Sequence, residues 1–564
     1  MQPVESLISY ATDKRITALV AKERGKCAAK ASGKLERRLR NPVFAKVRSM
    51  TPLHSEWCHP GKGRMPKRTD RGLSSWTAGK KRATARILAG MQWGRRKDPD
   101  CEWGRELDRF IGSVREALSG TGPLVLETPV TLYKFKKALS DDGPFVYRPI
   151  CRYNDLLTKV ILSLSVNWLL SFADRCFGTH MLFLRTASKQ ADGTWKVPDF
   201  LDAIDRIGAY RKAHDRNRIW VGECDIQKFY DIFNHDDIIR CFEDLFAEVR
   251  ERTGTPDGAF DPFRRVLKAY LASYSFPREV LGRNGDPGFW KEETARLRNE
   301  GHADPVCLFQ WVDEDDFVRS GCYSPGEFAR VVEEGGIGIP QGGSLSCLIV
   351  NVVMRCIDRR ILSRKDPDRL FLRYCDDIVL MNTDRERCAA DLDTYRQALT
   401  EHKLLYHPFR PFSGLKRGRR NRDAFWEAKS KGPYLWGRGA GDASNWVAFL
   451  GYEMHRNGEV RIRKDKVAQE LRRIKRAYYS ALKAKPENRT EEKFVEKFNK
   501  VSHHLLDFER ISTGRFTLSQ AARLDKHLLW NARRAARKIG LPESVTGLID
   551  TYTKVITEKA TAVE

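Results

Sequence analysis

Two short, largely apolar segments flank three residues, Cys375, Asp376 and Asp377, and this pattern constrains the fold most strongly. Residues 370–374 and 378–381 are each long enough for one strand, so the pattern predicts a tight β-hairpin with two aspartates at its tip. A further apolar segment, residues 219–224, leads directly into Asp225. We therefore expect a sheet that carries carboxylates at the ends of two of its strands.

Adjacent carboxylates at a turn repel each other, so the pair is unfavourable unless a cation neutralises it. An isolated Asp-Asp pair is more often simple turn chemistry between strands. Mg²⁺ prefers carboxylate oxygens combined with substrate phosphates, and two such ions about 4 Å apart can stabilise the attacking and the leaving oxygen of a displacement at phosphorus. Asp225, Asp376 and Asp377 are therefore predicted to hold two Mg²⁺ ions, for which Mn²⁺ is an alternative.

The charge of the chain points to a polyanionic partner. Its 564 residues include 101 Lys and Arg against 74 Asp and Glu, a formal net charge of +27. The first hundred residues alone hold 24 basic and 8 acidic residues. Solvated basic faces are common, but nucleic acid would relieve this self-repulsion and release counterions. We therefore expect the chain to bind nucleic acid.

The pattern along the chain divides it into three parts. Residues 1–125 are predicted to be a basic helical extension, with helices around 14–40 and 80–94. Residues 126–460 would hold the catalytic sheet, helices near 156–164 and 348–361, and a loosely patterned insertion at about 245–335. Residues 461–564 read as a helical basic domain, with Thr517 and Ser519 as candidate helix caps.

Neither a membrane span nor a zinc site is expected. The longest apolar stretch, residues 160–172, is short of the ~20 residues that cross a bilayer and contains Ser and Asn. The N-terminus lacks a signal-peptide pattern, so we expect a cytoplasmic protein without a membrane partner. Cys58, His59 and His54 have no second ligand pair at zinc spacing, which leaves them a weak candidate.

The acidic segments belong to longer motifs that resemble those of reverse transcriptases. Residues 371–380 resemble the catalytic hairpin with its xxDD motif, and residues 225–233 resemble the first metal motif. Three further motifs are similar to the fingers motif, the Pro-Gln-Gly motif and the primer grip: residues 147–150, 337–346 and 449–454. The five motifs follow the order of the family and cover about residues 130–465.

This resemblance implies an α+β right-hand polymerase, with fingers and palm built on antiparallel sheet, a helical thumb or C-terminal domain, and the helical basic N-terminal extension. It also implies an RNA-directed DNA polymerase, a nucleotidyltransferase that copies an RNA template into a DNA product from dNTPs. Asp225 and Asp376 would then bind both metal ions, Asp377 would be the third carboxylate, and the Ile226 carbonyl would be an additional ligand.

The resemblance implies roles for residues around the metals. Tyr230 would occupy the space of a ribose 2′ hydroxyl and so select dNTPs, with Phe229 as the alternative ring. Gln341 would contact the incoming nucleotide, while Gly342 and Gly343 let the backbone approach the template. Arg148 would bind the triphosphate through paired hydrogen bonds. Possible helpers of Arg148 are Lys134 and Lys136, and the primer grip would comprise Leu450, Gly451 and Tyr452.

One motif departs from the family pattern. Many reverse transcriptases carry a lysine between the hairpin and the primer grip that can protonate pyrophosphate. Here the interval contains Lys429 and Lys431, of which Lys429 is our choice. A solvated lysine without a catalytic role is an equally open interpretation.

Comparison with individual groups favours a bacterial defence-associated reverse transcriptase. Group II intron proteins usually have Ala in place of Cys375 and often a C-terminal endonuclease with paired Cys and His, and retron enzymes carry Val-Thr-Gly in a setting unlike residues 545–547. Diversity-generating enzymes typically lack the Pro-Gln-Gly form found here. What remains resembles enzymes of phage defence and abortive infection, several of which use a structured noncoding RNA and some of which form homo-oligomers.

Other functions stay open. The chain could be a retron-like or group II intron-like reverse transcriptase, or an RNA-binding scaffold that does not polymerise. Three retained carboxylates weigh against a scaffold, and Tyr230 weighs against an RNA-dependent RNA polymerase.

Overall fold

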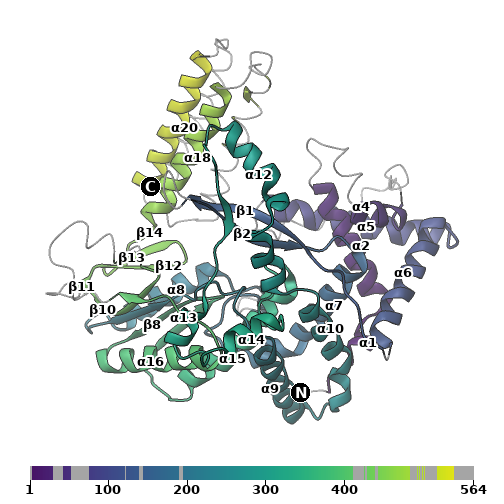
Figure 1. The fold of residues 1–564 in the computed structure, drawn as a ribbon, viewed down its shortest axis with the longest axis horizontal. Helices are drawn as coiled ribbons and strands as arrows, with labels where there is room; N and C mark the ends of the chain where they lie inside the picture. The colour runs from purple at the N-terminus through teal and green to yellow at the C-terminus, as the bar shows by residue number, and fades with distance from the viewer. Residues whose placement is uncertain are drawn as a thin grey trace.

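The computed structural model describes residues 3–29, 42–52, 75–120, 122–138, 144–189, 195–410, 428–437, 443–482 and 518–538, together with residues 425, 492, 494, 495, 498 and 501. Helices and strands are mixed along this part of the chain, and several of the strand pairs are antiparallel. Figure 1 shows strands β8 and β10 of the largest sheet at the lower left, strands β1 and β2 of a separate sheet near the centre, and the long helices α18 and α20 rising above them.

The helices are α1 (Leu7–Tyr10), α2 (Asp13–Ala29), α4 (Pro42–Ser49), α5 (Ser75–Lys97), α6 (Glu102–Ser119), α7 (Leu156–Ala173), α8 (Phe200–Ala213), α9 (His235–Thr253), α10 (Asp261–Ala272), α11 (Gly282–Asn284), α12 (Pro287–Asn299), α13 (Glu314–Arg319), α14 (Glu327–Glu333), α15 (Ser344–Leu362), α16 (Arg385–Glu401), α18 (Lys464–Leu482) and α20 (Leu518–Lys538).

The strands are β1 (Val130–Ala138), β2 (Phe145–Arg152), β3 (Ser188–Lys189), β4 (Trp195–Lys196), β5 (Trp220–Cys224), β6 (Cys307–Phe309), β7 (Leu370–Tyr374), β8 (Asp377–Asn382), β9 (Phe409–Arg410), β10 (Ser430–Trp436), β11 (Ala443–Ser444), β12 (Trp446–Phe449), β13 (Tyr452–His455) and β14 (Val460–Ile462).

The central sheet has the strand order β11-β10-β5-β8-β7, with β9 also paired to β10. Strands β7 and β8 form the hairpin predicted from the sequence, and the pairing of Tyr374 with Asp377 leaves only Cys375 and Asp376 in the turn. Strand β8 is also antiparallel to β5, with Cys224 opposite Ile378. The sheet register therefore brings the C-terminal end of β5 to the hairpin turn.

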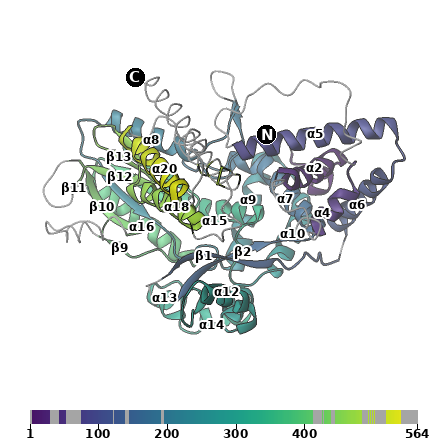
Figure 2. The same ribbon diagram turned by 90° about the horizontal axis from the view of Figure 1, so that it is seen from above.

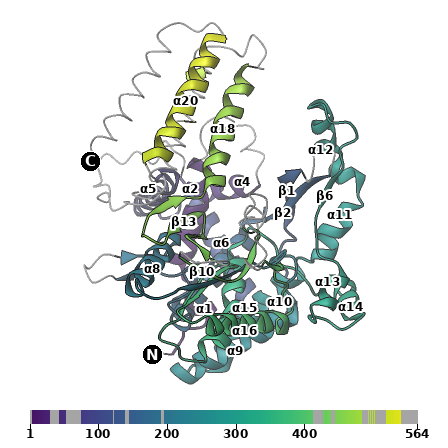
Figure 3. The ribbon, with the colours of Figure 1, turned by 90° about the vertical axis from the view of Figure 1, so that its left-hand side faces the viewer.

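The two faces of this sheet belong to different hydrophobic cores. Phe371 and Leu380 pack into a core shared with α7, α9, α10 and α15, whereas Leu372 and Val379 pack into a core shared with α8, β12, β13, α18 and α20. This alternation follows from the two-residue period of a strand. Helix α16 lies along β5, β8 and β10, and Figure 3 shows the α18–α20 pair standing on the opposite side.

The N-terminal helices share the first core instead of standing apart from it. Helix α2 packs against α5, and α1, α2, α4 and α6 contact α7; Figure 2 shows this group gathered at one end of the molecule. Helix α6, which we did not predict, buries Leu107, Phe110, Ile111, Val114 and Leu118, an apolar stripe at helical spacing. The limits near residues 125 and 460 stay predictions.

The predicted helices are mostly present with shifted ends. Residues 14–29 of the predicted 14–40 helix lie in α2, and residues 80–94 lie within α5. The helix predicted over 348–361 is α15, which begins four residues earlier, and Ser519 lies inside α20. Residues 30–41, Thr517, residues 545–547 and the zinc candidate of His54, Cys58 and His59 lie outside the described residues.

Residues 245–335, which we expected to be a loosely patterned insertion, contain several helices and one strand. Residue 245 lies inside α9, and strand β6 continues the β1–β2 sheet by pairing in parallel with β2. Phe246, Phe260 and Phe263 form a buried aromatic group, in which the rings of Phe246 and Phe260 stack at 4.4 Å. The segment is therefore part of the core. Its sequence did not show this, because the aromatic residues are spread among turn signals and the apolar periodicity is hard to see.

Helix α7 is longer than its sequence suggested. Within the described part of the chain, Leu156–Cys176 is the one helix that could cross a membrane by length and composition, with a mean hydropathy of 1.6 over its best window. The serines and Asn167 lie within the helix and do not interrupt it. Because 61% of that window is buried inside the protein, packing accounts for its apolar character.

Candidate active site

The three predicted metal ligands line one open cleft of about 700 Å³, which we call the aspartate cleft. It lies where β5 ends and the β7–β8 hairpin turns. Its walls come from five separate parts of the chain: Phe200, Glu223–Asp225, Tyr374–Ile378, Ala428–Lys431 (without Ser430) and Ala448–Gly451 with Arg463 and Lys466. Residues more than two hundred positions apart in the sequence therefore meet at this point.

Asp225 is held from several sides by main-chain and side-chain contacts. Its amide donates to Ser430 Oγ at 3.1 Å, and its carbonyl accepts from the His407 amide at 2.9 Å. Only 6% of the residue is exposed. The backbone of Ile226, the predicted additional ligand, is buried beside Tyr406 in an isolated bridge. The end of β5 is thus clamped between residues 405–407 and β10.

The carboxylates of the hairpin are electrostatically unfavourable without a cation. Desolvation and the Asp225 charge raise the pKa of Asp376 above its ordinary value. Desolvation and the charges of Asp376 and Asp225 raise the pKa of Asp377 to about 7. Because the Asp377 side chain also reaches solvent, water moderates this effect. A divalent cation would relieve the repulsion, and the all-oxygen donor set suits Mg²⁺.

Lys429 is the cation that faces these carboxylates. Its Nζ donates to Asp225 Oδ2 at 2.5 Å, and the side chain is 64% exposed. Burial alone would lower the pKa of Lys429, but the charges of Asp225, Asp377 and Asp376 raise it. His407 Nε2 lies 3.8 Å from the same Asp225 oxygen. Lys429 is therefore charged and close enough to exchange partners within the site.

Lys431, the rival candidate, has a different environment. It is buried, and its Nζ donates to Glu223 Oε2, while Tyr434 donates to the other Glu223 oxygen at 2.6 Å. This pair lies between β5 and β10, where both residues form part of the cleft lining. The structure thus places Lys429 at the metal ligands and Lys431 in a buried structural pair.

The two aromatic candidates for sugar selection are also separated. Phe229 is 4% exposed and packs on Phe233 at a ring distance of 4.7 Å. Tyr230 is half-buried, and its hydroxyl lies 3.8 Å from Cys375 Sγ in the hairpin turn. Phe229 is a core ring, whereas Tyr230 reaches the residue next to Asp376.

Gln341 and Gly342 lie against strand β2, outside the residues that line the aspartate cleft. The Cys151 amide donates to the Gln341 carbonyl at 2.7 Å. Gly342 has φ +114°, and a Cβ there would meet the Cys151 carbonyl at 3.2 Å, so this position requires glycine. Gly343 precedes α15 directly. Packing against β2 therefore explains the glycine at position 342 without any contact to a template.

Arg148 projects from the same strand and is exposed. Its backbone pairs with that of Lys134 across β1 and β2. The side chains of Lys134 and Lys136 lie outside the described part of the chain. Of the predicted nucleotide-binding residues, the structure thus brings Gln341 and Arg148 to one sheet, while Tyr230 stands at the hairpin.

The predicted primer grip forms a two-residue turn at the edge of the cleft. Leu450 and Gly451 have φ +48° and +89° and connect β12 to β13, where Phe449 pairs with Tyr452. Two consecutive positive φ values are typical of the tight hairpin turn that favours glycine. Leu450 and Gly451 line the cleft, whereas Tyr452 is buried and stacks on Phe200 at 6.1 Å.

Two basic residues of the cleft were not predicted from the sequence. Arg463 and Lys466 follow β14 and line the wall beside Gly451, and the Arg463 amide donates to the Gly451 carbonyl at 2.9 Å. The sequence signal for them was the position of Arg463 and Lys466 directly after the last strand of the primer-grip region. In a protein with so many basic residues that signal does not stand out.

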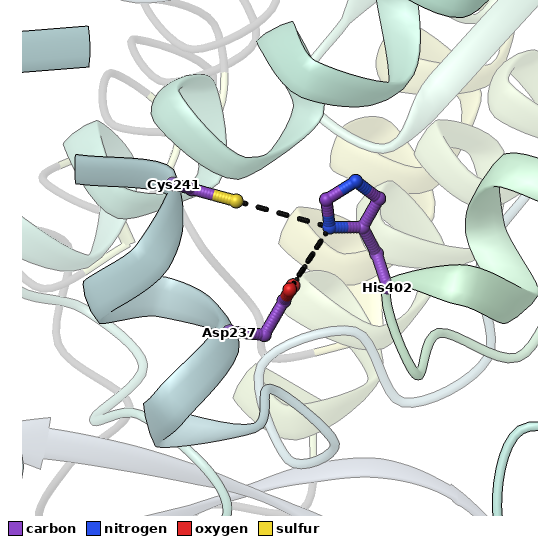
Figure 4. A group of neighbouring side chains, drawn as sticks. All are labelled: Asp237, Cys241 and His402. Carbon is purple, nitrogen blue, oxygen red and sulfur yellow. Dashed lines mark hydrogen bonds and ion pairs between the residues drawn. The ribbon is translucent and has the colours of Figure 1, made fainter. Parts of the chain in front are cut away.

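A second group of metal-ligand types lies elsewhere, between α9 and the end of α16. Figure 4 shows Asp237, Cys241 and His402 pointing toward one another, with ligand atoms within 4.8 Å. The Asp237 carboxylate accepts from His402 Nδ1 at 2.8 Å and also pairs with Arg240. His402 caps the C-terminal end of α16, where a histidine is favoured by the helix dipole. The group is best explained as an ion-paired link between two helices.

Comparisons with known proteins agree with this geometry. Residues 332–408 match the family model of the reverse transcriptase (RNA-dependent DNA polymerase). This segment includes the Gln341 loop, α15, the β7–β8 hairpin with Asp376 and Asp377, and α16. No curated protein matches the chain.

Several solved structures show a distant likeness. One is telomerase from Candida albicans in complex with a TWJ fragment of telomeric RNA, with 10% identity over 86% of this chain and 77% of that chain, at a TM-score of 0.30. Another is apo telomerase from Candida tropicalis, with 13% identity over 99% and 90% of the two chains and a TM-score of 0.30. Scores of this size carry no conclusion about template, primer or partner.

The α+β class expected from the sequence, with antiparallel sheet and many helices, is confirmed, whereas the right-hand polymerase architecture stays a prediction. The segment that matches the family model carries two of the three clustered aspartates. The chain therefore contains a reverse transcriptase domain, the polymerase domain of RNA-directed DNA polymerases, which are nucleotidyltransferases.

Proposed function

We propose that this protein copies RNA into DNA by a two-Mg²⁺ mechanism and works with a structured noncoding RNA in bacterial antiphage defence. The observation that carries the catalytic part is the meeting of Asp225, Asp376 and Asp377 with Lys429 and the Leu450–Gly451 turn in one open cleft. A non-polymerising RNA-binding scaffold would have no use for three mutually repelling carboxylates.

Asp225 and Asp376 would hold both ions, with Asp377 as the third carboxylate and the Ile226 carbonyl as an additional oxygen. The chemistry that bound Mg²⁺ supplies is activation of the primer 3′ hydroxyl and charge stabilisation of the leaving pyrophosphate. The residues of the protein then orient the reactants around that centre. The Leu450–Gly451 turn would support the primer end, and Tyr230 would exclude a ribose 2′ hydroxyl by steric contact.

Lys429 would deliver a proton from Nζ to the leaving pyrophosphate. In the absence of substrate its ammonium pairs with Asp225, which keeps it charged and inside the cleft. A phosphate group that enters the cleft competes for this ammonium, because charge-assisted hydrogen bonds to phosphate are strong. Arg463 and Lys466 offer further positive charge for the nucleic acid backbone along the same wall.

Primer extension on an RNA template tests the catalytic part. With Mg²⁺, the protein should incorporate dNTPs and reject rNTPs, and Asp376→Asn should reduce incorporation at least about 10³-fold. Asp393→Asn on the exposed side of α16 is the matched control and should stay at the original rate. Robust extension by the Asp376→Asn protein would contradict the two-metal assignment, and extension with rNTPs alone would indicate an RNA polymerase.

The noncoding RNA is supported by the basic N-terminal helices. Lys46 and Arg48 on α4 and Arg96 and Lys97 on α5 are exposed and described in the structure. Replacing these four with Gln should lower the slope of log affinity against log salt by up to about 0.7 to 0.9 for each lost phosphate contact. An unchanged slope together with a smaller assembly on sizing would instead indicate an oligomerisation surface.

The defence role rests on the resemblance to defence-associated enzymes and on no feature of the fold. A phage challenge of bacteria that carry the wild-type gene or the Asp376→Asn variant measures it directly. Protection by both versions, or by neither, would contradict a defence function that depends on DNA synthesis. Sequencing the nucleic acid that copurifies would identify the RNA and distinguish retron-like and group II intron-like alternatives. A cytoplasmic location is part of the same proposal.

A further inference from the structure

A buried ionic network stands directly behind the catalytic hairpin. Arg373 on β7 is fully buried, and its Nε and Nη2 donate to the Asp358 carboxylate of α15 at 2.7 to 3.0 Å. Asp358 is 1% exposed and also lies 2.9 Å from His180 Nε2. None of these three side chains lines the aspartate cleft.

The third donor of Arg373 reaches the turn itself. Arg373 Nη1 donates to the carbonyl of Cys375 at 3.2 Å, one residue before Asp376. Cys375 has φ +61°, a left-handed conformation in which a side chain costs energy. Such a residue keeps this conformation only where its surroundings hold it. The guanidinium therefore links the strained residue of the turn to a carboxylate fixed on a buried helix.

The network is fixed at its other end as well. The Arg373 amide donates to the His180 carbonyl, and the Leu182 amide donates to the Arg373 carbonyl, both at 3.0 Å. The His180 ring stacks on Phe371 at 5.1 Å. Burial alone would raise the pKa of Asp358, but the Arg373 and His180 charges hold it below its ordinary value. Asp358 therefore remains an anion that can orient the guanidinium.

We propose that Arg373 is a positioning residue for catalysis, which acts through the Cys375 carbonyl to hold Asp376 and Asp377 in the geometry that binds the metal ions. Asp358 orients Arg373, and His180 orients Asp358. Lysine cannot replace this arginine, because its single ammonium cannot span the carboxylate and the carbonyl as the planar fork does. The inference rests on the proposed polymerase function, since it concerns the metal ligands of that reaction.

A second buried pair provides a matched control. Arg369 stands just before β7, four residues from Arg373, and its Nε donates to Asp391 of α16 at 2.7 Å. The side chains of Arg369 and Asp391 are 4% and 5% exposed. Arg369 also donates to the carbonyls of Ile361 and Arg364, and these bonds do not involve the catalytic turn. Removing it should affect stability without moving the aspartates.

The experiment compares Arg373→Lys with Arg369→Lys in the full-length protein. Both should lower Tm, but only Arg373→Lys should lower kcat, by about 10- to 100-fold, as expected for misplaced catalytic groups. Arg373→Lys should also raise the Mg²⁺ concentration at half-maximal rate and weaken Mn²⁺ binding, measured by electron paramagnetic resonance on a complex with a chain-terminated primer. Affinity for the primer–template should not change, because the cleft walls are intact.

A double variant separates positioning from stability. Arg373→Met combined with Asp358→Leu removes both buried charges, so its Tm should exceed that of Arg373→Met alone. Its kcat should remain as low as that of the single variant, because the contact to Cys375 is still missing. Recovery of kcat together with Tm, or an equal loss of kcat in Arg369→Lys, would overturn the inference. If the wild-type protein does not extend primers at all, the proposed function fails instead.

Discussion

The two sides of the active site differ in how far the folded chain alone completes them. On the metal side, Asp225, Asp376, Asp377, Lys429 and the turn at Leu450 line one cleft, and the register of β5, β7 and β8 brings the three aspartates together. On the nucleotide side, Arg148 is exposed on a separate three-stranded sheet, and Gln341 touches that sheet through its backbone. The groups proposed to bind the metal ions are therefore held close together by the fold, whereas the groups proposed to bind the nucleotide lie outside that cleft.

The difference predicts how substitutions divide between kcat and KM. Pre-organised groups act in the transition state, so their loss should lower kcat. Groups that bind the triphosphate before and during reaction equally should mainly raise KM when they are removed.

Lys429→Ala should lower kcat about 100-fold, because loss of a positioned general acid typically costs two to four orders of magnitude. The KM for dNTP should change little. Single-turnover kinetics on a fixed primer–template would measure both. Lys431→Met is the control: it breaks the buried pair with Glu223 and should lower Tm more than Lys429→Ala does. An unaltered rate in Lys429→Ala would identify that lysine as a solvated bystander.

Tyr230→Ala should reduce discrimination against rNTPs by about 10- to 100-fold, because it removes a steric exclusion at the sugar. The ratio of kcat/KM for dNTP and rNTP measures this change. Phe229→Ala should leave the ratio intact and instead destabilise the protein by about 3 to 5 kcal/mol, since it empties a core position. The opposite result, with selectivity altered only in Phe229→Ala, would show that Phe229 and not Tyr230 contacts the sugar.

Arg148→Ala should raise the KM for dNTP about tenfold with a smaller change in kcat, corresponding to the loss of one charge-assisted contact. Tm should be unchanged, because Arg148 is exposed. Arg152, exposed on the same strand, provides a control of equal charge. A fall in kcat that exceeds the rise in KM would show that Arg148 belongs with the pre-organised groups.

Asp377→Asn should raise the Tm of the metal-free protein by a few degrees at pH 8. The pKa of Asp377 is raised to about 7 in the folded protein, against about 4 in an unfolded chain. The folded state thus loses stability as pH rises from 4 through 7, so the gain from Asn should be largest above pH 7 and vanish near pH 4. Thermal melts in EDTA across this range would measure it, and a gain independent of pH would contradict the shift.

The contrast also explains what the sequence could predict. The β7–β8 hairpin and the meeting of Asp225 with it were predictable, because short apolar segments that lead directly into aspartates indicate buried strands, and the motifs resemble those of one metal site. The different environments of Lys429 and Lys431 were not predictable, since residues two positions apart share one side of a regular strand. Neither the start of β10 at Ser430 nor its bulge between residues 431 and 434 can be read from the sequence. Arg373 was equally hidden, because its partners Asp358 and His180 are distant along the chain.

The integration of residues 245–335 and of α6 shows the same limit on a larger scale. Helix α6 has a regular apolar stripe that could have been recognised, but the basic character of the first hundred residues suggested a separate nucleic-acid-binding arm. Contacts between α7 and the N-terminal helices depend on which faces meet, and this cannot be read from composition.

The burial of α7 under the N-terminal helices has a consequence for biosynthesis. A ribosome releases α1, α2, α4 and α6 before the apolar α7 segment, so part of the cover of α7 is already available when it emerges, whereas α10 and α15, which also contact α7, follow later. An order with α7 first would expose a stretch of membrane-like hydropathy to chaperones and translocation machinery while its cover was still being made. The N-terminal helices can therefore shield α7, a central helix of the first core, from the time it is synthesised.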